Sequence, residues 1–135
     1  MKRLISLFAA VAMLFTLACS SAPATPGQAA VRLYDLLASG EYEVATEEVQ
    51  YNIEDPAQLA EAKAFMVSMM KEKLAPQLES KGGLASTEVL SETIAEDGQS
   101  ARVSIKVVYG NGTEDTNKLD FVKDSNGDWK VPYNK

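Results

Sequence analysis

The sequence contains no histidine and only one cysteine, Cys19. Without histidine the chain cannot build a Ser-His-Asp triad, a Cys-His pair or the usual zinc sites. A single thiol cannot close a disulfide within the chain, so packing alone must hold the fold together. Chemistry based on carboxylate, tyrosine or lysine side chains stays open, and we expect no metal site and no cofactor.

Basic residues are outnumbered, with 13 lysines and arginines against 19 aspartates and glutamates and a formal net charge of −6. The sequence has no basic patch, no phosphate-binding glycine loop and no internal repeat. An acidic surface is repelled by nucleic acid and by anionic lipid headgroups. We therefore expect no nucleic-acid partner, and any attachment to a membrane should come from a covalent lipid.

The chain also lacks an apolar run long enough to span a bilayer, which takes about 20 residues. Residues 4–18 are almost wholly apolar but form a shorter run, and Lys2 and Arg3 precede them. A short positive end followed by such a run is typical of a secretory signal peptide. The sequence thus predicts that residues 1–18 are removed from the mature protein.

The stretch Phe15-Thr16-Leu17-Ala18-Cys19 resembles the lipobox of bacterial lipoproteins. The resemblance implies cleavage before Cys19 and a diacylglycerol joined to its sulfur, which makes the lipid bilayer a partner. Residues 19–27 are predicted to be the lipidated cysteine and a flexible tether. Ser20 occupies the position after the cysteine, where an aspartate would favour retention of a lipoprotein in the inner membrane of enteric bacteria. The implied location is the cell envelope, on the periplasmic side of the outer membrane if the host has two membranes.

Residues 28–135 are predicted to form a single α+β domain, because this length supports one modest core. A capping signal at Thr25, Pro26 and Gln28 begins a first helix that stops near Ser39-Gly40. Residues 42–49 predict a second, shorter helix. Its glutamates are expected in solvent rather than at a cation site: Glu41, Glu43, Glu47 and Glu48.

The longest helix is predicted over residues 56–75, after the capping residue Asp55. Pro76 should kink or stop it, because proline lacks the N–H donor and its ring strikes the preceding turn. Apolar residues recur in this helix with helical spacing, and several are methionines. The methionine-rich face has two interpretations, adaptable core filling or the wall of an apolar pocket.

After Gly83 apolar and polar residues alternate, which predicts strands over residues 84–95, 101–109, 114–123 and 128–133. Asn111-Gly112 and Asn126-Gly127 predict hairpins, the first with positive φ at both central residues. The polar stretch 124–128 superficially suggests a calcium loop, but its glycine falls at the wrong position. A hairpin with polar turn residues explains it better.

The order of helix, short helix, long helix and antiparallel four-stranded meander is similar to the nuclear-transport-factor-2-like (NTF2-like), cystatin-like fold. Residues 28–135 resemble a family of short bacterial lipoproteins with a domain of unknown function. The similarity rests on turn and core residues rather than catalytic ones: Ser39-Gly40-Glu41-Tyr42, Val107-Val108-Tyr109-Gly110-Asn111-Gly112 and Asn126-Gly127-Asp128-Trp129-Lys130-Val131.

Relatives of this broad fold include ketosteroid-isomerase-like and dehydratase-like enzymes, with an acid or base inside the cone between sheet and helices, and many proteins that only bind. The inward strand positions named from the alternation carry neither group: Val103, Ile105, Val107, Leu119, Phe121, Trp129 and Val131. We expect a non-catalytic binding or interaction domain, with a small pocket enzyme as the alternative. An acidic residue beside a tyrosine on the concave face would favour the enzyme, and the polar candidates are Tyr34, Tyr51 and Tyr109.

The candidate partners of the domain are an envelope protein or an apolar small ligand, and the oligomeric state stays open. The candidate site is an apolar pocket between the long helix and the sheet, and the alternative is a closed core. Its predicted lining is Phe65, Met66, Met69 and Met70 on the helix, with Ile105, Val107, Phe121 and Trp129 on the sheet.

Overall fold

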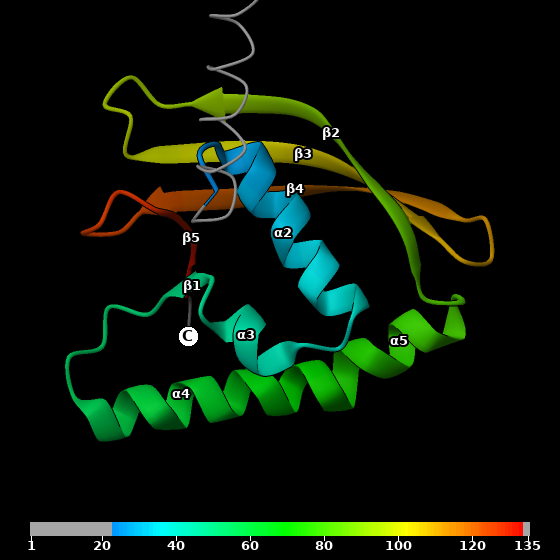
Figure 1. Ribbon diagram of the computed structural model, residues 1–135, viewed down its shortest axis with the longest axis horizontal. Helices are drawn as coiled ribbons and strands as arrows, with labels where there is room; N and C mark the ends of the chain where they lie inside the picture. Colours follow the sequence, from blue (N-terminus) through cyan, green and yellow to red (C-terminus); the bar gives the residue numbers. More distant parts are fainter. Residues whose placement is uncertain (1–22, 134–135) are drawn as a thin grey trace, which may run out of the picture.

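The computed structural model describes residues 23–133; the predicted signal peptide and Cys19 lie outside them. The fold is α+β, with helices packed on a mostly antiparallel sheet (Figure 1). The elements are α2 (Pro26–Ala38), α3 (Tyr42–Thr46), β1 (Val49–Gln50), α4 (Pro56–Met69), the π-helical turn η1 (Met70–Leu74), α5 (Ala75–Ser80), β2 (Leu84–Ile94), β3 (Ser100–Tyr109), β4 (Glu114–Lys123) and β5 (Trp129–Pro132). Among residues 23–133, no helix combines the length and the apolar character needed to span a membrane.

Helix α2 begins where the capping signal places it. The Thr25 hydroxyl accepts a hydrogen bond from the Gln28 N–H at 3.1 Å, and Pro26 takes the first helical position. From β2, the Glu92 carboxylate accepts the Gly27 N–H at 2.6 Å. Because Pro26 and Gly27 are buried, these two residues belong to the domain and not to the tether predicted over residues 19–27.

The sheet has five strands in the order β1-β5-β4-β3-β2, one strand more than the four that the sequence predicts. The added strand comes from the predicted second helix, which ends at Thr46 instead of reaching residue 49. Strand β1 runs parallel to β5, and the Val131 N–H donates to the Glu48 carbonyl at 2.8 Å. The pairing of Val49 with β5 therefore replaces another helical turn, a non-local contact that local spacing does not reveal.

The long helix does not stop at residue 75. The Ala75 N–H bonds to the Met70 carbonyl, five residues back, so the helix widens for one turn just before Pro76. A widened turn tolerates the proline ring and the missing donor. Helix α5 then continues to Ser80 at an angle to α4 (Figure 1), which makes the kink prediction correct and the predicted end wrong.

The hydrophobic core lies between α2 and the concave face of the sheet. Its buried members are Ala29, Ala30, Ala101, Val103, Ile105, Val107, Tyr109, Phe121 and Trp129. Helix α4 supplies none of these residues. It lies beyond the β1 edge and packs on α3, so α2 rather than the longest helix covers the central strands (Figure 1).

Both predicted hairpin turns form, but in a three-residue geometry. In the first, Gly112 has φ 88° and its N–H donates to the Tyr109 carbonyl at 3.0 Å, while Asn111 does not adopt positive φ. The prediction of positive φ at both positions is wrong, because this loop needs left-handed backbone at its glycine alone. In the second, the Asp124 carboxylate accepts the N–H groups of Asn126 and Asp128, both at 2.9 Å, as expected for a hairpin.

Gly110 fixes the β3–β4 hairpin against the turn that follows α5. Its N–H donates to the Gly83 carbonyl at 2.8 Å, and a Cβ at this position would overlap the Gly82 carbonyl. We predict that Gly110→Ala lowers the free energy of unfolding by about 2 kcal/mol, measured by urea denaturation. Gly112→Ala is the control, since it meets only the positive-φ penalty of about 1 kcal/mol. Equal losses of unfolding free energy in the two variants would contradict the close approach of Gly110 to the Gly82 carbonyl.

Candidate functional site

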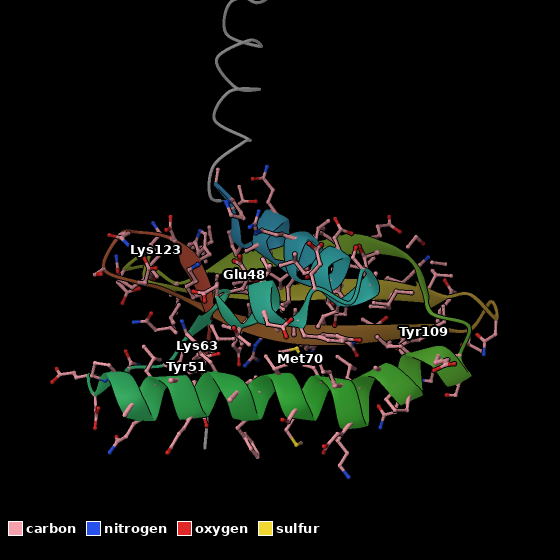
Figure 2. All side chains as sticks on the ribbon, turned by 60° about the horizontal axis from the view of Figure 1, so that its bottom comes forward. Glu48, Tyr51, Lys63, Met70, Tyr109 and Lys123 are labelled. Carbon is pink, nitrogen blue, oxygen red and sulfur yellow. The ribbon has the colours of Figure 1, made fainter. Side chains whose placement is uncertain are left out.

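The residues predicted to line an apolar pocket do not come together. Phe65 is 57% exposed and Met69 39% exposed, so both lie on the outer side of α4 and the prediction is wrong for them. Met66 is partly buried, and Met70 is buried and points toward the rest of the domain (Figure 2). The four sheet residues, Ile105, Val107, Phe121 and Trp129, form part of the closed core under α2.

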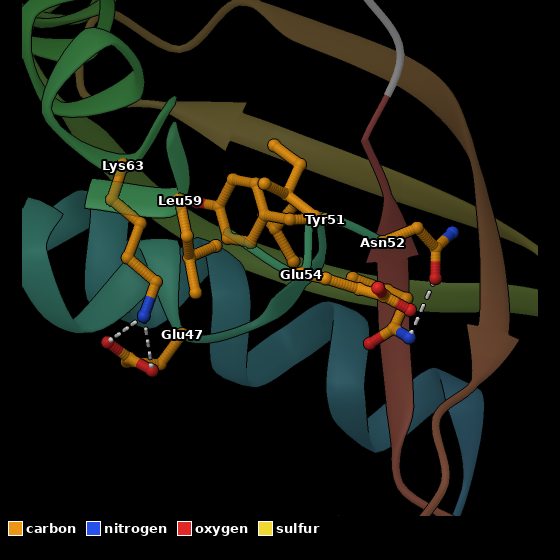
Figure 3. A pocket seen from close by; sticks show the side chains of 9 residues that line it. Glu47, Tyr51, Asn52, Glu54, Leu59 and Lys63 are labelled. Carbon is orange, nitrogen blue, oxygen red and sulfur yellow. Dashed lines mark hydrogen bonds and ion pairs between the residues drawn. The ribbon is translucent and has the colours of Figure 1, made fainter. Parts of the chain in front are cut away.

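An open cavity of about 410 Å³ lies instead between β1 and the first half of α4 (Figure 3). Its lining mixes apolar, amide and charged side chains: Glu47, Val49, Gln50, Tyr51, Asn52, Ile53, Glu54, Leu59 and Lys63. Most of this lining comes from β1 and the extended segment after it, and Glu47 follows the end of α3. Sequence reasoning missed the cavity because it assigned part of this stretch to a helix.

Tyr51 forms a fixed wall of the cavity. It is 8% exposed, its hydroxyl donates to the Thr46 carbonyl at 3.1 Å, and its ring lies 5.2 Å from the Tyr133 ring between centroids. Burial raises the pKa of the Tyr51 hydroxyl above its ordinary value, which keeps it a protonated donor at neutral pH. Because that hydroxyl is engaged below the surface, Tyr51 presents an aromatic wall and not a reactive oxygen.

The charged groups of the cavity are arranged asymmetrically. The Lys63 ammonium contacts both Glu47 carboxylate oxygens, at 3.1 and 3.3 Å, and lies 6.0 Å from the centre of the Tyr51 ring (Figure 3). Glu54 forms no ion pair with any residue from 23 to 133. With Lys63 offset by Glu47, the carboxylate of Glu54 leaves this cavity with excess negative charge.

Asn52 carries the sole positive φ among the non-glycine residues of the described chain, at 54°. Its amide oxygen accepts a hydrogen bond from the Gln50 amide at 3.1 Å. Left-handed backbone at a non-glycine residue is uncommon and costs on the order of 1 kcal/mol. The strain falls where the chain leaves β1 and turns away along the rim of the cavity.

A second polar group lies on the concave face near the β3–β4 hairpin. Asp115 and Asn117 are in register with the buried residues Val107 and Ile105. The Tyr109 hydroxyl donates to Asp115 at 2.9 Å, and the Asn117 amide donates to the Tyr34 hydroxyl at 2.9 Å. Extending the alternation back from Leu119 would have placed both polar residues on this face.

Burial is the main cause that raises the pKa of the Tyr34 and Tyr109 hydroxyls, and the Asp115 carboxylate raises both further, so both stay protonated. The Asp115 carboxylate is on the rim, with its side chain 49% exposed. It also accepts a long contact of 3.5 Å from Lys81, whose ammonium lies 4.5 Å from the centre of the Tyr109 ring. Tyr109 and Asp115 therefore place an acidic residue beside a tyrosine on the concave face, as expected for an enzyme. The Asp115 carboxylate is not buried, however, as a catalytic carboxylate with a raised pKa would be.

Glu48 corrects the expectation that the glutamates of this region are all solvated. It is 6% exposed, and its carboxylate lies 2.9 Å from Arg32 and 3.8 Å from Lys130. This group is an internal ion cluster of the scaffold, and within residues 23–133 no set of acidic or thiol side chains is grouped closely enough to hold a metal ion.

The chain belongs to the family described as "Domain of unknown function (DUF4878)", whose model matches residues 18–132. No curated protein sequence matches the chain. The family membership and the fold agree with the predicted class, an NTF2-like domain of unknown function.

Solved structures give the same fold at low sequence identity. A Campylobacter jejuni protein described as a "putative NTF2-like transpeptidase" matches with a TM-score of 0.67 and 16% identity, over 82% of this chain and 100% of the other. RPA3114 from Rhodopseudomonas palustris, a SEC-C motif containing protein, matches with a TM-score of 0.53 and 17% identity, over 88% of this chain and 84% of the other. These similarities show the NTF2-like fold and transfer no activity.

Proposed function

We propose that this protein is a membrane-anchored lipoprotein of the bacterial cell envelope whose NTF2-like domain binds a ligand without transforming it. The observation that carries the binding role is the open cavity of about 410 Å³ beside β1, which falls within the usual size range of ligand sites. Its rigid aromatic wall and its amide and charged groups provide both contact area and orientation. The lipobox-like sequence at Cys19 supports the anchor.

The chemistry of the lining supports binding over catalysis. The Tyr51 hydroxyl is committed to a backbone carbonyl, and the Lys63 ammonium is committed to Glu47. The groups in this cavity therefore suit recognition of a bound molecule by contact and charge.

We predict that filling the cavity abolishes binding. Leu59→Trp places a larger side chain at the α4 wall, while Ala64→Trp adds the same group at an exposed position of the same helix. The full-length protein in detergent micelles is titrated with a panel of short peptides, amines and aromatic fragments, and backbone amide shifts are followed by NMR. Ligands should shift the signals of residues 49–54 in the wild type and in Ala64→Trp but not in Leu59→Trp.

A ligand that binds the folded state should also raise the melting temperature, since a hundredfold excess over its dissociation constant stabilises by about 2.7 kcal/mol. Identical shifts in Leu59→Trp and the wild type would remove the cavity as the site. If no member of the panel shifts residues 49–54, the binding function assigned to this cavity is refuted for these ligand classes.

The second candidate is a small pocket enzyme, and the contact between Tyr109 and Asp115 on the concave face favours it. A protonated tyrosine beside a carboxylate can donate to a developing oxyanion while the carboxylate removes a proton. The exposed position of Asp115 and its contact with Lys81 weigh against a desolvated base. Exchange of deuterium into a cyclic ketone by the wild type, and its loss in Asp115→Asn, would place this role ahead of binding.

A further inference from the structure

Strand β1 is an edge of the sheet, and its free side faces the cavity. Gln50 lies in register with Pro132 and accepts the Tyr133 N–H at 2.9 Å, while the Glu48 carbonyl accepts the Val131 N–H at 2.8 Å. Backbone groups alternate between the two sides of a strand, so Val49 and Tyr51 direct theirs away from β5. Among the backbone hydrogen bonds of residues 23–133 that lie outside the helices and strand ladders, none uses the N–H or carbonyl of Val49 or Tyr51.

The space next to this edge is open rather than covered. Val49 and Tyr51 both line the cavity, and the opposite wall is α4, through Leu59 and Lys63 (Figure 3). An uncovered strand edge readily pairs with another extended chain. Here the cavity separates β1 from α4, so the free edge of β1 borders an open space.

The positive φ of Asn52 ends β1 and turns the chain along the cavity rim. The Gln50 side-chain amide donates a hydrogen bond to the Asn52 side-chain oxygen at 3.1 Å, and this bond stabilises the turn. Beyond the turn, Ile53 and Glu54 line the cavity with Asn52. A strained residue held in place at the mouth of a cavity is the pattern found at binding sites.

We propose that an extended peptide segment carrying basic side chains binds in this cavity by adding a strand to the free edge of β1. The inference rests on the proposed function and names the ligand class for the same site. Backbone hydrogen bonds to Val49 and Tyr51 supply the main contacts, as in other complexes formed by strand addition. Alternate side chains of the peptide then point toward Tyr51 and Leu59 on one face.

Charge selects a basic peptide over an acidic one. Lys63 is already paired with Glu47, whereas Glu54 has no basic partner among the described residues. The chain as a whole carries a formal charge of −6, which favours approach of a basic segment. A small amine would pair with Glu54 but would form no strand-type hydrogen bonds with the backbone of Val49 and Tyr51.

The test uses the full-length protein in micelles and the peptide Ac-Lys-Val-Lys-Val-Lys-NH₂ as the probe. Two further probes have the same sequence with N-methyl groups on the valines alone or on the lysines alone. Because only alternate N–H groups of an added strand face β1, one methylated probe should bind about tenfold more weakly and the other should bind as the parent does. The amide signals of Val49 and Tyr51 should shift with the parent peptide.

A matched pair of charge variants tests the recognition of the basic side chains. Glu54→Gln should weaken binding of the parent peptide about two- to fivefold, and Glu61→Gln, the same change at an exposed position of α4, should not. Equal affinity of all three probes would overturn strand addition, because charge alone would then explain binding. No binding of the parent peptide would also overturn it, while shifts of residues 49–54 by panel fragments, lost in Leu59→Trp, would leave the proposed function standing.

Discussion

Replacing Cys19 with serine is expected to abolish incorporation of labelled fatty acid and to release the protein from the membrane. The sulfur of Cys19 is the sole thiol in the chain, so no other residue can accept a thioether-linked diacylglycerol. Each buried methylene contributes about 0.8 kcal/mol to membrane binding, and two or more acyl chains make the anchor durable. The acidic domain offers no electrostatic attraction to anionic headgroups that could replace it.

The experiment compares the wild type with Cys19→Ser in cells fed labelled palmitate, followed by separation of membrane and soluble fractions. Ser20→Asp is the matched control, because it keeps the thiol. It should be labelled like the wild type but, in a host with two membranes, should move to the inner membrane. Equal labelling of Cys19→Ser and the wild type would contradict the lipid anchor, and wild type found with the inner membrane would contradict the outer-membrane assignment.

The sequence predicted the elements that depend on local chemistry. The Thr25 cap, the alternation in β3 and the glycine turns involve residues a few positions apart, and all are present. It failed for β1 because the partner of that strand, β5, lies near the other end of the described chain. A two-residue strand carries no periodicity of its own, so only the pairing reveals it.

The candidate site was predicted poorly for a related reason. The methionine-rich helix was expected over the sheet, but apolar spacing does not state which helix covers which strand. Helix α2, with small alanines facing the sheet, packs closest to it, and α4 is left beside the β1 edge. The cavity lies between β1 and α4 because α4 does not cover the sheet. The residues that line it form no recognisable sequence motif.

Glu48→Ala is expected to destabilise the domain by about 3 kcal/mol, the largest loss from a single charged residue. Glu48 compensates Arg32 at 2.9 Å and Lys130 at 3.8 Å, and the Lys130 side chain is only 18% exposed. Removing one member of a buried ion pair costs about 3–5 kcal/mol, because the remaining charge is left without compensation. The lower end of this energy range applies here, because the Arg32 side chain is 46% exposed and water can solvate its charge when Glu48 is removed.

Chemical denaturation and thermal melting of the full-length protein measure this effect, and a fall of melting temperature on the order of ten degrees is expected. Glu43→Ala is the matched control: it also breaks an ion pair, with Lys71 at 3.2 Å, but both side chains are largely exposed, so the melting temperature should hardly change. Combining Glu48→Ala with Arg32→Ala should recover part of the loss, because the arginine is then no longer an unpaired charge. A Glu48→Ala variant as stable as Glu43→Ala would show that the cluster does not stabilise the fold. The junction between α2, β1 and β5 would then depend on its backbone pairing alone.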